Sequence, residues 1–223
     1  MKGRQFALST MEADRRPPYA RRLLAAAILL AALGAAGLCL APRGQAAAAR
    51  PNDCGEWLVN GGFEALTLAP WEGSSAAGFS LLTDFMAHSG DQSAWLGGYQ
   101  NASDFLTQTV TLPARVITAT LQLWVQIDTQ EPDNAAALDL LTLEVRDMAG
   151  ALLSTAATLS NQDHNASWSL RVYNLPLYPQ QTVRLVLHAV GDAGQNSTDF
   201  HVDDVSLAVC AANQPRFIPW LGR

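Results

Sequence analysis

The sequence is poor in basic residues outside its first fifty positions. It contains a single lysine, Lys2, and residues 51–223 carry six arginines against eighteen acidic residues, which gives this region a net charge of −12. Such a charge repels the phosphates of nucleic acid and of anionic lipid. We therefore expect no nucleic-acid partner, whereas neutral ligands, divalent cations and basic partners remain compatible.

Signatures of catalysis are also missing. The four histidines, at positions 88, 164, 188 and 201, do not have the spacing of metal ligands, and no nucleophile elbow or phosphate-binding loop occurs. Two carboxylates across a cleft could hydrolyse glycosides, but nothing in the sequence places Glu144 opposite a second acid. We therefore predict that the protein is not an enzyme. His201 alternates with Phe200 and Val202, which predicts a surface position for its side chain.

The one long apolar run lies near the start of the chain. Residues 23–40 carry no charge and follow Arg15, Arg16, Arg21 and Arg22, and small residues occupy positions 46–49. This is the order of a signal peptide, yet eighteen residues at about 1.5 Å each could also span a bilayer. We expect residues 1–49 to be a signal peptide or an N-terminal membrane-anchor helix. Either way the domain is extracytoplasmic, secreted or at the cell surface, and residues 23–40 contact the membrane only if they are not cleaved.

Cysteines are scarce, with three in the chain. Cys39 lies in the apolar run, which leaves Cys54 and Cys210 for the exported part. In an oxidising compartment two such cysteines form a disulfide by default, and the alternative is a pair of free buried thiols.

Beyond residue 50 no helical periodicity is convincing, and short alternating runs are separated by Gly, Pro, Asn and Asp. This pattern predicts one all-β sandwich or barrel at residues 51–210, followed by a tail at 211–223 whose role stays open. We expect strands at 121–127, 141–146 and 183–188, and near 56–59, 79–84, 92–97, 104–111, 151–158, 168–174 and 199–209.

Several short motifs carry a family resemblance through their order and spacing. They are the segment LVNGGFE at 58–64, Trp71, the segment HSGDQSAWL at 88–96, the stretch 168–185 and the segment VDDVSL at 202–207. Together they resemble the galactose-binding-like jelly rolls of carbohydrate-binding modules in secreted bacterial proteins. The resemblance implies a jelly-roll β-sandwich whose first and last strands lie together.

In that family a structural Ca²⁺ commonly lies where the first and last strands meet. The resemblance thus implies a Ca²⁺ site here, with Glu64, Asp91, Asp203 and Asp204 as candidate ligands, and Ca²⁺ does prefer six to eight oxygen ligands. The alternative is that these acids are ordinary solvated surface residues.

The resemblance also implies sugar binding on one face of the sandwich, where aromatic rings and polar groups contact the glycan. If the strands at 121–127, 141–146 and 183–188 are neighbours, Trp124 lies among long polar side chains. The candidate ligand-binding residues are Gln122, Trp124, Gln126, Thr142, Glu144, Arg146, Arg184 and His188. In the alternative, loops cover this face and Trp124 and Val186 pack beneath them.

We thus expect a non-catalytic module that binds a glycan or cell-surface polymer weakly. The second hypothesis is a cell-surface adhesion or structural domain that contacts a protein partner through loops or through the tail.

Overall fold

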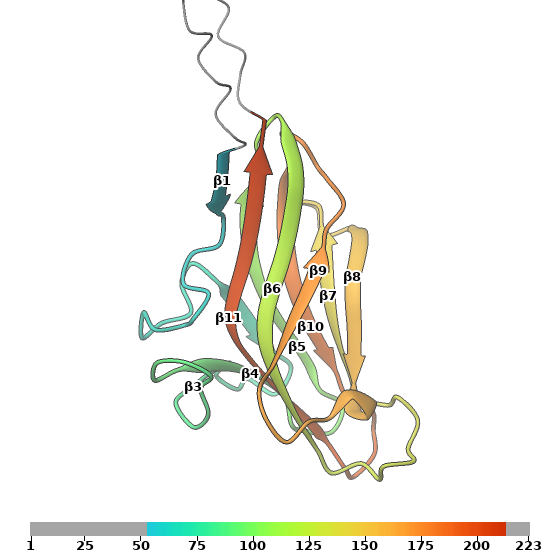
Figure 1. The fold of residues 1–223 in the computed structure, drawn as a ribbon. Coiled ribbons are helices and arrows are strands. Elements are labelled where there is room, and N and C mark those ends of the chain that lie inside the picture. The colour runs from blue at the N-terminus through green and yellow to red at the C-terminus, as the bar shows by residue number, and fades with distance from the viewer. Residues whose placement is uncertain (1–52, 213–223) are drawn as a thin grey trace, which may run out of the picture. The chain divides into compact units, whose positions relative to one another are not determined.

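The computed structural model describes residues 53–212, which form two packed antiparallel sheets (Figure 1). The predicted all-β jelly-roll sandwich is therefore confirmed. The segment 1–49, with Cys39 and the apolar run, lies outside the described residues, as does the tail from residue 213 onward. Within residues 53–212 the structure contains no helix that is long and apolar enough to cross a membrane.

The first sheet has the order β3-β4-β11-β6-β9, and β1 also pairs with β11. Its strands are β1 (Asp53–Glu56), β3 (Leu82–Thr83), β4 (Ser93–Gly97), β6 (Val116–Thr129), β9 (Ser169–Asn174) and β11 (Thr198–Ala211). β4 pairs with the first part of β11 and β1 with its last part, so the opening and closing segments of the domain lie side by side.

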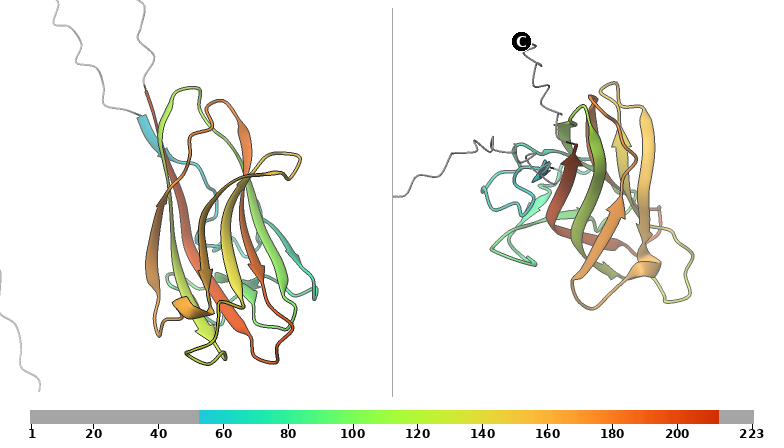
Figure 2. Two further views of the ribbon diagram at one scale, coloured as in Figure 1. Left: turned by 90° about the vertical axis from the view of Figure 1, so that its right-hand side faces the viewer. Right: turned by 45° about the horizontal axis from the view of Figure 1, so that its top comes forward.

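The second sheet has the order β2-β5-β10-β7-β8. Its strands are β2 (Glu72–Ser75), β5 (Ser103–Thr111), β7 (Leu140–Arg146), β8 (Leu152–Ser160) and β10 (Thr182–Val190), and the short 3-10 helix η1 (Asn161–Asp163) follows β8. Figure 2 shows the two layers from two further sides. Sequence alternation located the strands of both sheets except β2, whose Gly-Ser composition carries no apolar pattern, and β1, which lies at Asp53–Glu56 rather than at 56–59.

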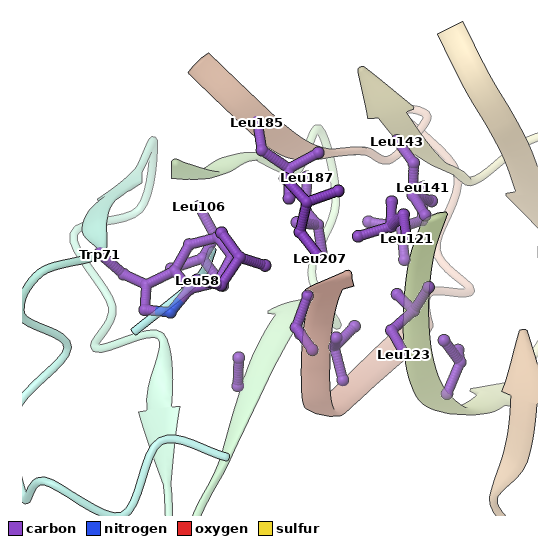
Figure 3. Packing of buried hydrophobic residues seen from close by; sticks show 14 of the residues in the cluster. Leu58, Trp71, Leu106, Leu121, Leu123, Leu141, Leu143, Leu185, Leu187 and Leu207 are labelled. Carbon is purple, nitrogen blue, oxygen red and sulfur yellow. The ribbon is translucent and has the colours of Figure 1, made fainter. Parts of the chain in front are cut away.

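The core fills the space between the sheets (Figure 3). Alternate residues of each strand point inward, so Leu121 and Leu123 of β6 meet Leu143 of β7 and Leu187 of β10, and all four are fully buried. Trp71 joins this core, and its Nε1 donates a hydrogen bond to the carbonyl of Asn60 at 3.0 Å.

The predicted disulfide is confirmed, because Cys54 of β1 lies directly opposite Cys210 of β11 and is bonded to it. Glu56 reinforces the same junction, since its Oε1 accepts the backbone N–H groups of Trp57, Leu58 and Leu207. Burial raises the pKa of Glu56, but these bonds and one from the Ser206 hydroxyl outweigh it and hold the pKa below its usual value. The two ends of the domain are therefore joined covalently and by an ionised carboxylate.

Candidate ligand-binding face

The structure divides the predicted ligand-binding residues between two faces. β7 and β10 are neighbours in the second sheet, whereas β6 belongs to the first. The expectation that Trp124 lies among the polar side chains of 141–146 and 183–188 is therefore wrong, because β6 is in the opposite layer. Gln122, Trp124 and Gln126 face outward from the first sheet, and Thr142, Glu144, Arg146, Arg184 and His188 face outward from the second.

The register of the second sheet arranges its outward side chains in rows across β5, β10 and β7. The three rows are Phe105–His188–Thr142, Thr107–Val186–Glu144 and Thr109–Arg184–Arg146. The residues between them along each strand, such as Leu106, Leu185 and Leu143, are buried in the core. We call this set of nine side chains the β5–β10–β7 face.

An aromatic pair lies on this face. The rings of Phe105 and His188 are stacked, with centroids 3.9 Å apart and planes 12° apart. Burial lowers the pKa of His188, and although the carboxylates of Glu144 and Asp104 raise it, the result stays below its usual value. His188 is therefore neutral near pH 7, and the pair offers an uncharged aromatic surface.

An ion pair lies beside the aromatic stack. The Nε of Arg146 donates to Oε2 of Glu144 at 2.5 Å, and the hydroxyl of Thr142 donates to Oε1 at 3.1 Å. Glu144 is buried and Arg146 is also held by the carbonyl of Gly150. Because both oxygens of Glu144 are engaged, the carboxylate is fixed in one orientation.

Arg184 completes the face. It lies directly opposite Arg146, and its Nε is buried without a hydrogen-bond partner among the described residues. Val186, next along the strand, is only 3% exposed although it points away from the core, so its neighbours on the face enclose it. The face thus has an apolar floor, two guanidinium groups, one carboxylate and a buried N–H group that lacks an acceptor.

The outer face of the first sheet differs, because the chain's own turn lies against it. The ring of Trp124 is stacked on His88, with centroids 3.8 Å apart, and Trp168 lies edge-on to the same imidazole. Gln126 donates through Nε2 to Asp128 at 3.3 Å. Trp124 therefore packs against the turn that begins at His88.

The four predicted calcium ligands gather around this turn. Oε1 of Glu64 accepts the N–H groups of Asp91 and Gln92, both at 2.9 Å. Oδ2 of the fully buried Asp203 accepts those of His88 and Ser89. Asp204 accepts from the Ser89 hydroxyl and lies 2.7 Å from Nδ1 of His88. The turn at 88–92 is therefore held on one side by a carboxylate of the first segment and on the other by carboxylates of the last strand.

The charges and contacts of these residues decide whether they could hold a cation. Burial raises the pKa of Asp203, and the neighbouring charge of Asp204 adds to this, although the N–H donors oppose it. Across residues 53–212, no three His, Cys, Asp or Glu side chains are arranged to hold a metal ion. Any Ca²⁺ here would need backbone carbonyls as ligands besides Glu64 and Asp203, which is within the range that Ca²⁺ accepts.

The predicted surface position of His201 is wrong. Its side chain does point outward from β11, but it is only 5% exposed, because Thr83, Phe85, Met86 and Trp95 line the same pocket around it. Phe105 and Thr107 were missed by the sequence analysis. Their signal was present, since both alternate with the inward residues Leu106 and Val110 in a predicted strand.

Comparison with known proteins supports the fold. A scan of protein-family profiles gave no match, and a search of curated proteins gave none. Among solved structures, the carbohydrate-binding module TmCBM61, determined with β-1,4-galactotriose, is 20% identical with a TM-score of 0.51 and covers 69% of this chain and 97% of its own. The K3 cleaved adhesin domain of Lys-gingipain from Porphyromonas gingivalis is 18% identical with a TM-score of 0.50, over 70% and 99%. The chain thus has a β-sandwich like that of carbohydrate-binding modules, as the sequence motifs predicted.

Proposed function

We propose that this protein is an exported, non-catalytic module that binds a glycan on its β5–β10–β7 face. The observation that carries the proposal is the Phe105–His188 stack beside the Glu144–Arg146 ion pair. A neutral aromatic surface next to fixed hydrogen-bonding groups is the combination that a sugar ring requires, since sugars have flat apolar faces edged by hydroxyl groups.

Each group on the face contacts a different part of the sugar. The Phe105–His188 pair contacts the apolar side of a sugar ring through the ring face or edges that their mutual stacking leaves open. Glu144 accepts hydrogen bonds from sugar hydroxyls, and the unpaired Nε of Arg184 donates one to a sugar oxygen. The face is the surface of a sheet, so it encloses only one side of a ligand and we expect weak binding to a polymer.

The fold likeness indicates where to begin the search for a ligand. TmCBM61 was determined with β-1,4-galactotriose, so galactans are the first polymers to test. A glycan array with the intact protein then extends the search to other glycans and cell-surface polymers.

Affinity electrophoresis in galactan gels tests the proposal with Phe105→Ala. We expect roughly tenfold weaker retention, because the stacked ring contributes about 1–3 kcal/mol of apolar burial. Phe79→Ala is the matched control, since Phe79 is 55% exposed and lies against Tyr99 rather than on this face. Retention of Phe105→Ala equal to that of the parent protein, or no glycan bound on the array by folded protein, would refute the proposal.

We further propose a structural Ca²⁺ at the turn 88–91, held by Glu64 and Asp203 with Asp91 and Asp204 nearby. The burial of Asp203 without a basic side chain paired to it among the described residues supports this, because a cation would offset its charge. Chelator should lower the melting temperature of the metal-loaded protein and leave that of Asp203→Asn unchanged. An unchanged melting temperature in the parent protein, with no metal in purified samples, would exclude the ion.

The disulfide supports export, because disulfides persist in oxidising compartments. The protein is then secreted or held at the cell surface by residues 23–40. Mass spectrometry of the exported protein decides between these, since cleavage before residue 50 removes the apolar run.

A further inference from the structure

A cavity of about 390 Å³ lies on the outer side of the first sheet, away from the β5–β10–β7 face. The loop residues Thr83, Phe85 and Met86 form one wall, and Trp95 of β4, Asp128 of β6, and Asp199 and His201 of β11 form the rest. Its size is at the lower end of the range for small-molecule sites, which suits a ligand of one ring.

Aromatic rings shape this cavity. The Nε1 of Trp95 donates to Oδ1 of Asp199 at 2.7 Å, and its ring lies nearly parallel to that of His201, with centroids 6.2 Å apart. The ring of Phe85 is 83% exposed at the rim. An exposed phenylalanine over a fixed tryptophan gives a ligand two aromatic surfaces to contact.

The charge of the cavity is negative and unbalanced. Asp199 and Asp128 lie directly opposite each other on β11 and β6, a position in which like charges destabilise a sheet. Within residues 53–212 the ion pairs are His88–Asp204 and Arg146–Glu144, so no basic side chain compensates either carboxylate. The side chains that donate hydrogen bonds to Asp199 and Asp128, those of Trp95 and Gln126, are neutral.

His201 adds an unsatisfied group. The residue is only 5% exposed, and its buried Nδ1 has no hydrogen-bond partner among the described residues. Burial lowers the pKa of His201 although Asp199 and Asp128 raise it, so the imidazole is neutral near pH 7 and does not balance the two carboxylates. A buried polar atom without a partner is costly unless a ligand or water supplies one.

We propose that this cavity is a second binding site, for an amino sugar whose amine is free and protonated. The ammonium group lies between Asp128 and Asp199, the ring contacts Trp95 and Phe85, and a sugar hydroxyl pairs with Nδ1 of His201. Cations bind favourably to carboxylates and to aromatic faces, so each lining group has a partner in such a ligand. The site is separate from the glycan-binding face and does not depend on it.

Isothermal titration of the intact protein with glucosamine, N-acetylglucosamine and glucose tests this, because the three share a ring and differ at one substituent. We expect binding of glucosamine only. Asp128→Asn and Phe85→Ala should each weaken it, the first by roughly tenfold because a charge-assisted hydrogen bond is lost. Asp133→Asn, the same change in an exposed loop, and Phe105→Ala on the other face should have no effect.

Three results would overturn the proposal. Equal binding of the three sugars would show that the amine is not recognised, and unchanged affinity in Asp128→Asn would place the site elsewhere. Absence of glucosamine binding to folded protein, with Ca²⁺ bound in a manner that Asp128→Asn abolishes, would make the carboxylate pair a metal site. Melting temperatures of the variants establish that each is folded.

Discussion

The outer faces of the two sheets arise from the same alternation of residues but are used differently. The turn 88–91 lies against the first sheet, where the outward carboxylate of Asp203 accepts two of its N–H groups, and Glu64 of the segment 60–64 accepts a third. On the second sheet the outward side chains instead contact one another, as the stacked pair and the ion pair show. Where a face binds its own chain it contributes stability, whereas the parts that keep a polar atom unpartnered within residues 53–212, Nε of Arg184 on the second face and Nδ1 of His201 in the cavity of the first, are suited to a ligand.

Glycines explain why the chain fits closely on the first sheet. A Cβ on Gly61 would lie 1.8 Å from the carbonyl oxygen of Val205, and one on Gly90 would lie 2.3 Å from Oε1 of Glu64. Gly90 also has a φ of +65°, which favours glycine. The glycines of the motifs at 58–64 and 88–96 therefore permit backbone approach, which accounts for both motifs without reference to a ligand.

Removing the disulfide, which belongs to the first sheet, should have the largest effect on stability. Replacing both Cys54 and Cys210 by serine frees a loop of 156 residues, and the restored chain entropy should lower the free energy of unfolding by about 4–5 kcal/mol at most. Urea unfolding measures this, with reduced parent protein as the control that should match the variant. Glycan retention should survive in the folded fraction, because the link belongs to the first sheet. Two reactive thiols in non-reduced protein would contradict the assignment.

Gly61→Ala should have the second-largest effect on stability. The added methyl forces the backbone of β11 to move, which we expect to cost about 1–3 kcal/mol of unfolding free energy. Gly55→Ala is the matched control, since a Cβ there meets nothing within 4 Å. Equal stability of the two variants in urea would show that the contact between segment 60–64 and β11 is not close.

A change on the β5–β10–β7 face should affect glycan binding more than stability. Glu144→Gln keeps the shape of the side chain but removes the charge that holds Arg146, and we expect a loss of about 1–2 kcal/mol in unfolding free energy together with weaker glycan retention. Glu131→Gln, at a carboxyl in the loop that follows β6, is the control and should alter neither. Unchanged retention in Glu144→Gln would remove the ion pair from the proposed site.

Local pattern was enough to predict most of the strands and the side of each that faces the core, whereas β2 carried no pattern and the disulfide was expected from the two cysteines left in the exported part. It was not enough to place the strands in layers, because β6 and β7 have the same alternation and each pairs with a strand distant in sequence, β6 with β11 and β7 with β10. Trp124 was therefore grouped with the wrong neighbours. His201 shows the same limit, since its outward direction follows from alternation, whereas its burial depends on Thr83, Phe85 and Met86, more than a hundred positions away.

The smallest effect that we expect is a pH dependence on the second face. The pKa of His188 is below its usual value in the folded state, so between that pKa and about 6.5 the unfolded chain binds more protons and stability falls as the pH is lowered. Protonation of the folded protein puts a charge on the aromatic pair, so glycan retention should weaken once the pH falls to the lowered pKa of His188 and below it. The pKa of His201 is lowered as well, so replacing one of the two histidines removes only part of the pH dependence of stability.

His188→Gln should therefore lose less stability than the parent protein between pH 7.5 and 5.5, as measured by urea unfolding at each pH. His164→Gln is the control, because His164 is exposed and should leave the profile unchanged. The range lies above the pKa of Glu56, whose stabilising charge is lost only at lower pH because its pKa is also lowered. If His188→Gln and the parent protein have the same profile, His188 is not enclosed on the β5–β10–β7 face, and that face is more open to solvent than the stack with Phe105 requires.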